Sequence, residues 1–231
     1  MKKITLPDEI VYLAATVLLA LSVAMLTAAD FGISMIVAPA YILSQKLGFL
    51  TFGQSEYVIQ SVMFIVFCVL MKKAKAVYFS SFLNCLVYGA ILDGWRALVP
   101  LFNDTVTAPG SMGLPLRLVL FAVGMVMTSF SIALFFKCYL YPQVYDFFVK
   151  GISRHFGIDR TKFKLIFDAS CLLVGCAMTL LLFGKFVGIG VGTLIMTVLN
   201  GRLIGWSSAW LDKHIELKPL LPRLAKQFEL N

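Results

Sequence analysis

The ionisable residues that interrupt long apolar stretches are the ones in this chain whose chemistry needs an explanation. Asp168 lies in the apolar stretch 163–183, and Arg202 lies in the stretch 186–211. A charged side chain in such surroundings is costly, so it usually pairs with an opposite charge or faces a cavity. We expect Asp168 and Arg202 either to neutralise each other or to contact a solute or a coupling proton directly. We also expect both to matter more for function than Glu56.

Further polar residues and glycines in the apolar stretches are candidates for the same substrate-binding or coupling site. They are Gln60, Asn84, Asn200, Gly190, Gly192 and Thr193. The glycine-rich run 184–193 either unwinds beside a cavity or allows close helix packing. It lacks the preceding strand and the Lys-Ser/Thr ending of a nucleotide-binding loop.

A second group of charged residues lies at the ends of the first three apolar stretches, at those ends that would fall on the same side. The group is Asp30, Glu56, Asp93 and Arg96. Charged residues at helix ends commonly cap the helix or interact with solvent. The alternative is an outer vestibule that admits a polar solute.

The sequence offers no arrangement for catalysis. His155 and His214 have no Ser or Cys nucleophile and acid at a matching spacing. The five cysteines form no CxxC or Cys/His metal pattern. The net charge of +8 is not accompanied by a nucleic-acid-binding motif. We therefore expect no enzyme activity, no catalytic residues, no metal, no cofactor and no nucleic-acid partner.

The composition explains where these residues must reside. Of the 231 residues, 60% are hydrophobic and only 14% are charged, with a mean hydropathy of +0.89. A soluble domain is usually about 45–50% apolar and about 25% charged. We predict an all-α integral membrane protein with six transmembrane helices, the first of them an uncleaved span rather than a signal peptide. The expected spans are 10–29, 57–71, 77–92, 116–136, 163–183 and 186–211.

The distribution of basic residues orients these six spans. With both termini on one side, 15 of the 20 Lys and Arg residues fall on that side, four fall on the other, and Arg202 lies within a span. Cytoplasmic loops accumulate Lys and Arg. We expect a multi-pass protein of the cell inner membrane with both termini in the cytoplasm.

The two halves of the chain share one order of elements. Segments 33–47 and 142–156 are apolar but too short to span, so each is either a surface amphipathic helix or a re-entrant helix. At an offset near 110 residues, each half consists of a span, a short segment and two more spans. Three spans per half makes the halves inverted repeats. The predicted division is 1–102 for the first repeat, 103–114 for an outer linker, 115–212 for the second repeat and 213–231 for a cytoplasmic tail.

Several short motifs resemble those of the YitT/YczE-type small bacterial inner-membrane proteins. They are Tyr141-Pro142, Asp146, Ile166-Phe167-Asp168, the run 187–193, Gly201 and, in the first half, Phe31-Gly32-Ile33-Ser34. The resemblance covers nearly the whole chain. It implies a transporter of the inner membrane.

We therefore expect a transporter for a small polar or amphipathic solute, with export as one possible direction and alternating access between the repeats. One alternative is a substrate-binding membrane subunit of a multi-component importer. Another is a non-transporting membrane scaffold or regulator. Expected partners are the lipid bilayer, a small-molecule solute and either a homodimer mate or a membrane subunit docked on the small residues Ala20, Ala24 and Ala28.

Overall fold

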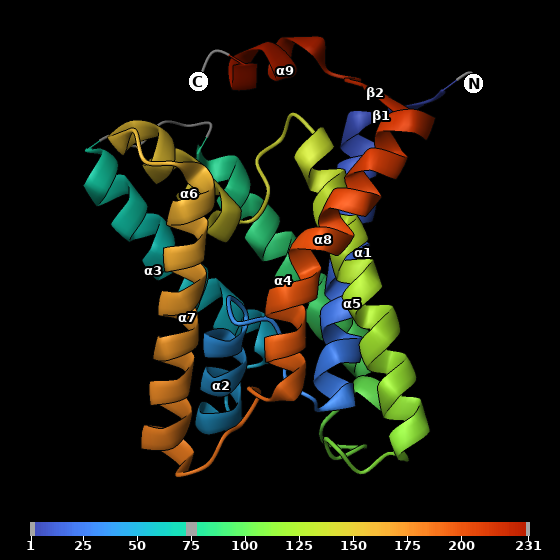
Figure 1. The fold of residues 1–231 in the computed structure, drawn as a ribbon, viewed down its shortest axis with the longest axis vertical. Helices are drawn as coiled ribbons and strands as arrows, with labels where there is room; N and C mark the ends of the chain where they lie inside the picture. The colour runs from blue at the N-terminus through green and yellow to red at the C-terminus, as the bar shows by residue number, and fades with distance from the viewer. Residues whose placement is uncertain (1–2, 73–77, 230–231) are drawn as a thin grey trace.

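Six long helices form the body of the protein (Figure 1). The structure is a computed structural model that describes residues 3–72 and 78–229. The long helices are α1 (Asp8–Ala29), α3 (Phe52–Met71), α4 (Phe79–Leu98), α5 (Leu114–Lys137), α7 (Arg160–Phe183) and α8 (Val191–His214). They confirm a long helix at each predicted apolar stretch. Lys2, Lys73, Lys75 and Val77, which the sequence prediction used, lie outside the described residues.

Four of these helices are long and apolar enough to cross a membrane, namely α1, α3, α5 and α7. The other two, α4 and α8, have 20 and 24 residues but carry more polar side chains. The fold is therefore mostly helical and compatible with a membrane protein.

Two helix starts differ from the prediction for identifiable reasons. α3 begins five residues earlier than expected because Thr51 caps it: the Thr51 side chain accepts from the Gln54 backbone N–H, and the Gln54 side chain accepts from the Thr51 N–H. α8 begins at Val191 rather than at residue 186. Gly188 has a φ of +70°, a left-handed conformation that interrupts helical geometry.

Two short helices, α2 (Ala38–Leu47) and α6 (Val144–Phe156), occupy the predicted short segments. In Figure 1 the chain turns back toward the middle of the molecule after α1 and after α5, and each short helix then runs outward again. Ala38, Ala40, Ile42 and Val144 are fully buried. Both helices thus re-enter the helical body, which excludes a plain surface helix.

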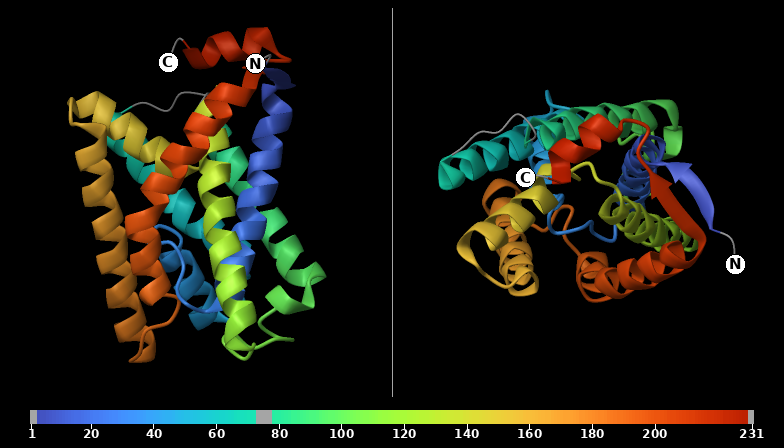
Figure 2. Two further views of the ribbon diagram at one scale, coloured as in Figure 1. Left: turned by 45° about the vertical axis from the view of Figure 1, so that its right-hand side comes forward. Right: turned by 90° about the horizontal axis from the view of Figure 1, so that it is seen from above.

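The helices pack in matching pairs. α1 lies along α5, and α1–α4 contacts are matched by α5–α8 contacts (Figure 2). Each short helix packs against both α3 and α7. One contact has no counterpart: α3 packs along α4, whereas α7 and α8, both fully described, do not pack along each other.

The small residues of α1 are inside this arrangement. Ala20 and Ala24 are fully buried, and Ala28 is 4% exposed. Of the two uses predicted for this stripe, close contact with another helix or with a partner, the structure shows the first. Neighbouring Ser22 and Leu26 lie against Gly124 of α5, so the tight helix crossing occurs within the monomer.

The all-α prediction needs one correction at the chain ends. β1 (Ile4–Pro7) pairs in parallel with β2 (Ile215–Lys218), with Ile4 opposite Ile215. Strand pairing occurs here because α1 begins beside the end of α8, and the ladder satisfies backbone groups of both extensions. The rest of the described chain adds the short 3-10 helix η2 (Pro100–Phe102) and the terminal helix α9 (Pro222–Glu229). Both termini lie at the same end of the molecule (Figure 1).

The close contact between α3 and α4 generates a testable prediction. A Cβ at Gly89 would lie 2.9 Å from the Gly53 carbonyl oxygen and 3.0 Å from Cζ of Tyr57, whereas a Cβ at Gly94 on the same helix would have no described atom within 4 Å. We expect Gly89→Ala to lower the free energy of unfolding by about 1–3 kcal/mol through overpacking. Gly94→Ala, the matched control, should leave stability equal or slightly higher. Thermal unfolding of the purified proteins in detergent measures both, and equal stability of the two variants would contradict the packing.

Candidate functional site

A small cavity of about 60 Å³ lies where the two short helices begin. Its walls are mainly apolar and come from α1, segment 33–37, α4, α5, the start of α6 and Met196 of α8. The polar residues that line it are Ser34, Tyr88, Thr128, Gln143, Tyr145 and Asp146. An apolar pocket with a few convergent polar groups is typical of a small-molecule site.

The starts of α2 and α6 face this cavity from opposite halves of the chain. Val37, the N-cap of α2, and Gln143, the N-cap of α6, both line it. Backbone N–H groups in the first turn have no partner within their helix, and the helix dipole adds partial positive charge. At α2 these N–H groups are already bonded to the Ser34 and Val37 carbonyls, and at α6 the Val144 N–H donates to Gln60, so what the two helices direct at the cavity is the positive end of each dipole.

A buried carboxyl adjoins the cavity behind Tyr145. Oε2 of Glu56 accepts hydrogen bonds from Nε2 of Gln60 at 2.8 Å and from the Tyr145 hydroxyl at 3.0 Å. Oε1 of Gln60 accepts from the Val144 backbone N–H at 3.2 Å. Glu56 and Gln60 are one helical turn apart on α3, and both have an exposed fraction of 0%. This cluster joins α3 of the first half to the start of α6.

The placement of Glu56 corrects the prediction of an outer position. Because α3 starts at Phe52, Glu56 lies inside the helix and points at α6. The expectation that Asp168 and Arg202 matter more for function than Glu56 stays a prediction, but the structure gives Glu56 a hydrogen bond to a side chain that lines the cavity.

Three buried polar atoms at or beside the cavity have no hydrogen-bond partner among the described residues. They are the Tyr88 hydroxyl, Nε2 of Gln143 and Oε1 of Glu56; the first two are neighbours that do not meet hydrogen-bond geometry with each other. Each such atom costs about 1–3 kcal/mol, and native structures contain few of them. Tyr88 and Gln143 line the cavity, so their polar groups are suited to a ligand, whereas Glu56 does not line it. The sequence prediction missed Tyr88, Gln143 and Tyr145, although Gln143 follows the Tyr141-Pro142 motif that it singled out.

The predicted pair of Asp168 and Arg202 is wrong. Oδ1 of Asp168 lies 3.3 Å from Nζ of Lys164, one turn earlier on α7, and the same Nζ lies 3.7 Å from Oδ1 of Asp146. Arg202 is exposed on α8. The two residues do not meet because α7 and α8 do not pack along each other in the described structure.

The two predicted asparagines join helices rather than line the cavity. Oδ1 of Asn84 accepts from the Thr16 hydroxyl at 2.9 Å, between α1 and α4. Oδ1 of Asn200 accepts from the Ser129 hydroxyl at 2.6 Å, between α5 and α8.

The predicted glycines and Thr193 position the segment that lines the cavity. The Gly192 N–H donates to the Phe31 carbonyl at 2.7 Å, and the Thr193 hydroxyl accepts from the Gly190 N–H at 3.3 Å. A Cβ on Gly190 would lie 2.6 Å from that Phe31 carbonyl oxygen. The run is both unwound and closely packed, because residues 184–190 are outside the helix and lie directly on the chain that enters α2.

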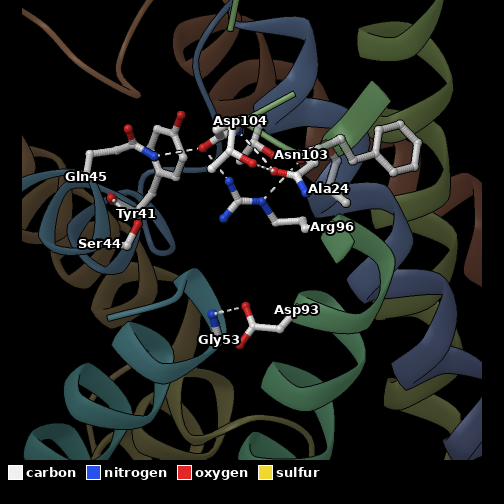
Figure 3. Close-up of polar contacts among 12 residues, drawn as sticks. Ala24, Tyr41, Ser44, Gln45, Gly53, Asp93, Arg96, Asn103 and Asp104 are labelled. Carbon is white, nitrogen blue, oxygen red and sulfur yellow. Dashed lines mark hydrogen bonds and ion pairs between the residues drawn. The ribbon is translucent and has the colours of Figure 1, made fainter. Parts of the chain in front are cut away.

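Two separate polar groups lie at the end of the molecule opposite the termini: Arg96 with Asp104, and Asp93 with Gly53 (Figure 3). Arg96 forms an ion pair with Asp104, which also accepts from Nε2 of Gln45 at 2.8 Å. Asp93 accepts from the Gly53 N–H at 2.8 Å, so it caps α3. The sequence prediction included Asp93 and Arg96 but missed Asp104, which lies in the polar linker.

Asp30 belongs to this end of the molecule but has a different partner. Its Oδ2 lies 3.7 Å from the Arg117 guanidinium. Burial raises the pKa of Asp30, and Arg117 opposes that shift. Asp30 and Arg117 thus connect the end of α1 to the start of α5.

The fold and the cavity define a helical protein with apolar helices around a mainly apolar cavity that a few polar side chains line. The chain belongs to a family of unknown function (DUF6198), which it matches over residues 6–209. No curated protein and no solved structure matches the chain. The matched range includes every element that lines the cavity. Within the described residues, no group of three or more His, Cys, Asp or Glu side chains could hold a metal ion.

Two tyrosines provide a matched test of the cavity. Tyr145→Phe removes a hydrogen bond to Glu56 and should lower the free energy of unfolding by about 1 kcal/mol. Tyr88→Phe removes a hydroxyl that has no described partner, so stability should be equal or higher. Thermal unfolding in detergent distinguishes the two. A larger loss for Tyr88→Phe would contradict the assignment of an unpartnered hydroxyl.

Proposed function

We propose that this protein is a membrane transporter that carries a small polar or amphipathic solute through the cavity at the starts of α2 and α6. The cavity is the observation that carries the proposal. It combines apolar walls, two inward-facing helix starts and the unpartnered polar groups of Tyr88 and Gln143. Those polar groups supply the specific contacts that a hydrogen-bonding solute would complete.

The outer surface supports insertion in a bilayer. Large apolar side chains are exposed along the long helices, among them Ile65, Val69, Leu173, Leu181 and Val198. An exposed apolar surface of this kind is stable against lipid. In the proposed arrangement α4 and α8 are spans as well, which gives six, and both termini are in the cytoplasm of a bacterial cell.

Matching contacts support inverted repeats. The Thr16–Asn84 bond joins α1 to α4, and the Ser129–Asn200 bond joins the corresponding helices α5 and α8. Each short helix also packs on the corresponding long helix of the other half: α2 packs on α7, and α6 packs on α3. This correspondence extends the similarity of element order to specific side chains.

The unequal packing of the two halves supports alternating access. α3 and α4 are in close contact at Gly53 and Gly89, whereas α7 and α8 do not pack along each other over their described lengths. In a protein of two inverted repeats, exchanging these two arrangements moves the opening from one side of the membrane to the other. With the alanine stripe buried, transport by this chain is favoured over docking to an importer through α1.

Labelling of introduced cysteines tests the six-span arrangement. Ala108 lies in the linker before α5, and Glu216 lies in β2 at the opposite end. We expect a membrane-impermeant maleimide to label Ala108→Cys in intact cells, but to label Glu216→Cys only after permeabilisation. The unsubstituted protein, with its native cysteines, is the control. Labelling of both variants from outside would contradict the three spans, α5, α7 and α8, that the proposal places between them.

Reconstitution into liposomes tests transport. Vesicles that contain the purified protein are incubated with a bacterial small-molecule extract, with and without an ion gradient, and mass spectrometry identifies the solutes that accumulate. We expect Tyr88→Phe and Gln143→Leu to reduce accumulation about tenfold, the effect of about 1.4 kcal/mol. Tyr57→Phe is the matched control, because its hydroxyl bonds the Leu86 carbonyl outside the cavity. If wild-type vesicles accumulate nothing beyond protein-free vesicles, the transporter proposal fails.

A further inference from the structure

We propose that the Glu56 carboxyl is the proton-coupling group of this protein: it holds a proton in the present closed arrangement and releases it when the cavity opens. The coupling of this proton to a solute rests on the proposed transport function. The protonation itself rests on the geometry around Glu56.

Glu56 has no compensating cation. Its side chain is fully buried, and no Lys, Arg or His among the described residues lies within ion-pair distance of it. The titratable groups around it are Cys85 and Tyr88 from α4 and Tyr145 from α6, with Asp93 further along α4. None of these carries a positive charge. Asp146, which lines the cavity, is the carboxylate that pairs with Lys164.

An isolated carboxylate in such surroundings is strongly disfavoured. Removing an unpaired ion from water costs several kcal/mol even after the protein relaxes, and a group in that position neutralises instead. Asp168 shows the contrast within this chain, because its carboxylate has Lys164 at 3.3 Å.

The hydrogen bonds of Glu56 fit the acid rather than the carboxylate. Both donors, Gln60 and Tyr145, reach the same oxygen, Oε2, which is what a carbonyl oxygen accepts. The other oxygen, Oε1, is buried and has no described partner. A carboxylate would leave a charged oxygen buried without a donor, which costs more than the neutral hydroxyl that the acid leaves there. The acid places its hydroxyl proton on Oε1, where it is available for donation.

Tyr145 connects this proton to the solute site. Its hydroxyl bonds Glu56, and the same side chain lines the cavity. When the cavity opens to water, the O–H bond of Glu56 breaks and the proton passes to a water molecule, which carries it to that side. The carboxylate that remains keeps the Gln60 and Tyr145 hydrogen bonds. Protonation from the other side restores the starting acid.

Infrared spectroscopy of the purified protein tests the protonation without any solute. The wild-type minus Glu56→Gln difference spectrum at neutral pH should show the carbonyl band of a carboxylic acid, and this band should shift in deuterated water as the proton exchanges. Asp168→Asn is the control, whose difference spectrum should show carboxylate bands. Carboxylate bands for Glu56, or an acid band that never shifts, would overturn the proposal.

Tyr145→Phe keeps the test decisive if Glu56→Gln does not fold. It retains the carboxyl and removes one donor to Oε2, so the acid carbonyl band should move to higher frequency as its hydrogen bonding weakens. An unchanged acid band in this variant would show that the band does not come from Glu56.

Proton movement in liposomes tests the coupling. Vesicles with an entrapped pH indicator receive the same small-molecule extract, and wild-type protein should move protons together with solute. Glu56→Gln should still exchange solute at equal pH but lose accumulation driven by a pH gradient. Solute accumulation without proton movement would overturn the coupling and leave transport standing. Absence of any solute movement by the wild type would overturn transport and coupling together, while the infrared result would still decide the protonation.

Discussion

Polar groups inside an apolar helical body must find partners there, and this constraint determines how the helices of this protein meet. Water is excluded, so each unpaired group costs more than it would at a surface. The described interhelical hydrogen bonds occur where helices cross: Thr16 with Asn84, Ser22 with Thr128, and Ser129 with Asn200. These bonds fix which helix faces which and leave the outer faces apolar. Among the described residues, three of the buried polar atoms that remain unpaired, on Tyr88, Gln143 and Glu56, are at or beside the cavity, whereas those on Asp8, Ser55, Asn84 and Trp95 belong to residues that do not line it.

The re-entrant helices follow from the same constraint. A helix start exposes several backbone N–H groups, which only a cavity or a specific acceptor can satisfy inside an apolar body. Gln60 provides one acceptor, for the Val144 N–H. The chain that enters α2 is held instead by the glycine segment, where the Ile33 N–H donates to the Gly188 carbonyl at 3.0 Å. Glycine is needed there because the two backbones approach too closely for a Cβ.

The proposed solute site and the proposed proton site share Tyr145, and this sharing has a mechanistic consequence. Any movement of α6 that opens the cavity also moves a donor of Glu56, because Tyr145 belongs to both. Solute access and the ionisation of Glu56 are then linked by one side chain, without a long relay. Linkage of this kind requires that the two states of the protein bind the proton with different affinity. In the proposed alternating access, the two states differ in the packing of α3–α4 and α7–α8, which is unequal in this structure.

The sequence by itself determined the helical class, the positions of the six long and two short helices, and the glycines and polar residues that must be explained. Hydropathy and chain breaks are local, so they can be read along the chain. The sequence did not determine which side chains contact each other. Asp168 pairs with Lys164 rather than Arg202, and Glu56 faces α6 rather than the outer end. Which charge meets which depends on how helices far apart in sequence rotate and pack. The β1–β2 pair and the burial of the alanine stripe were decided in the same way, because only the tertiary structure brings α1 alongside α5 and α8.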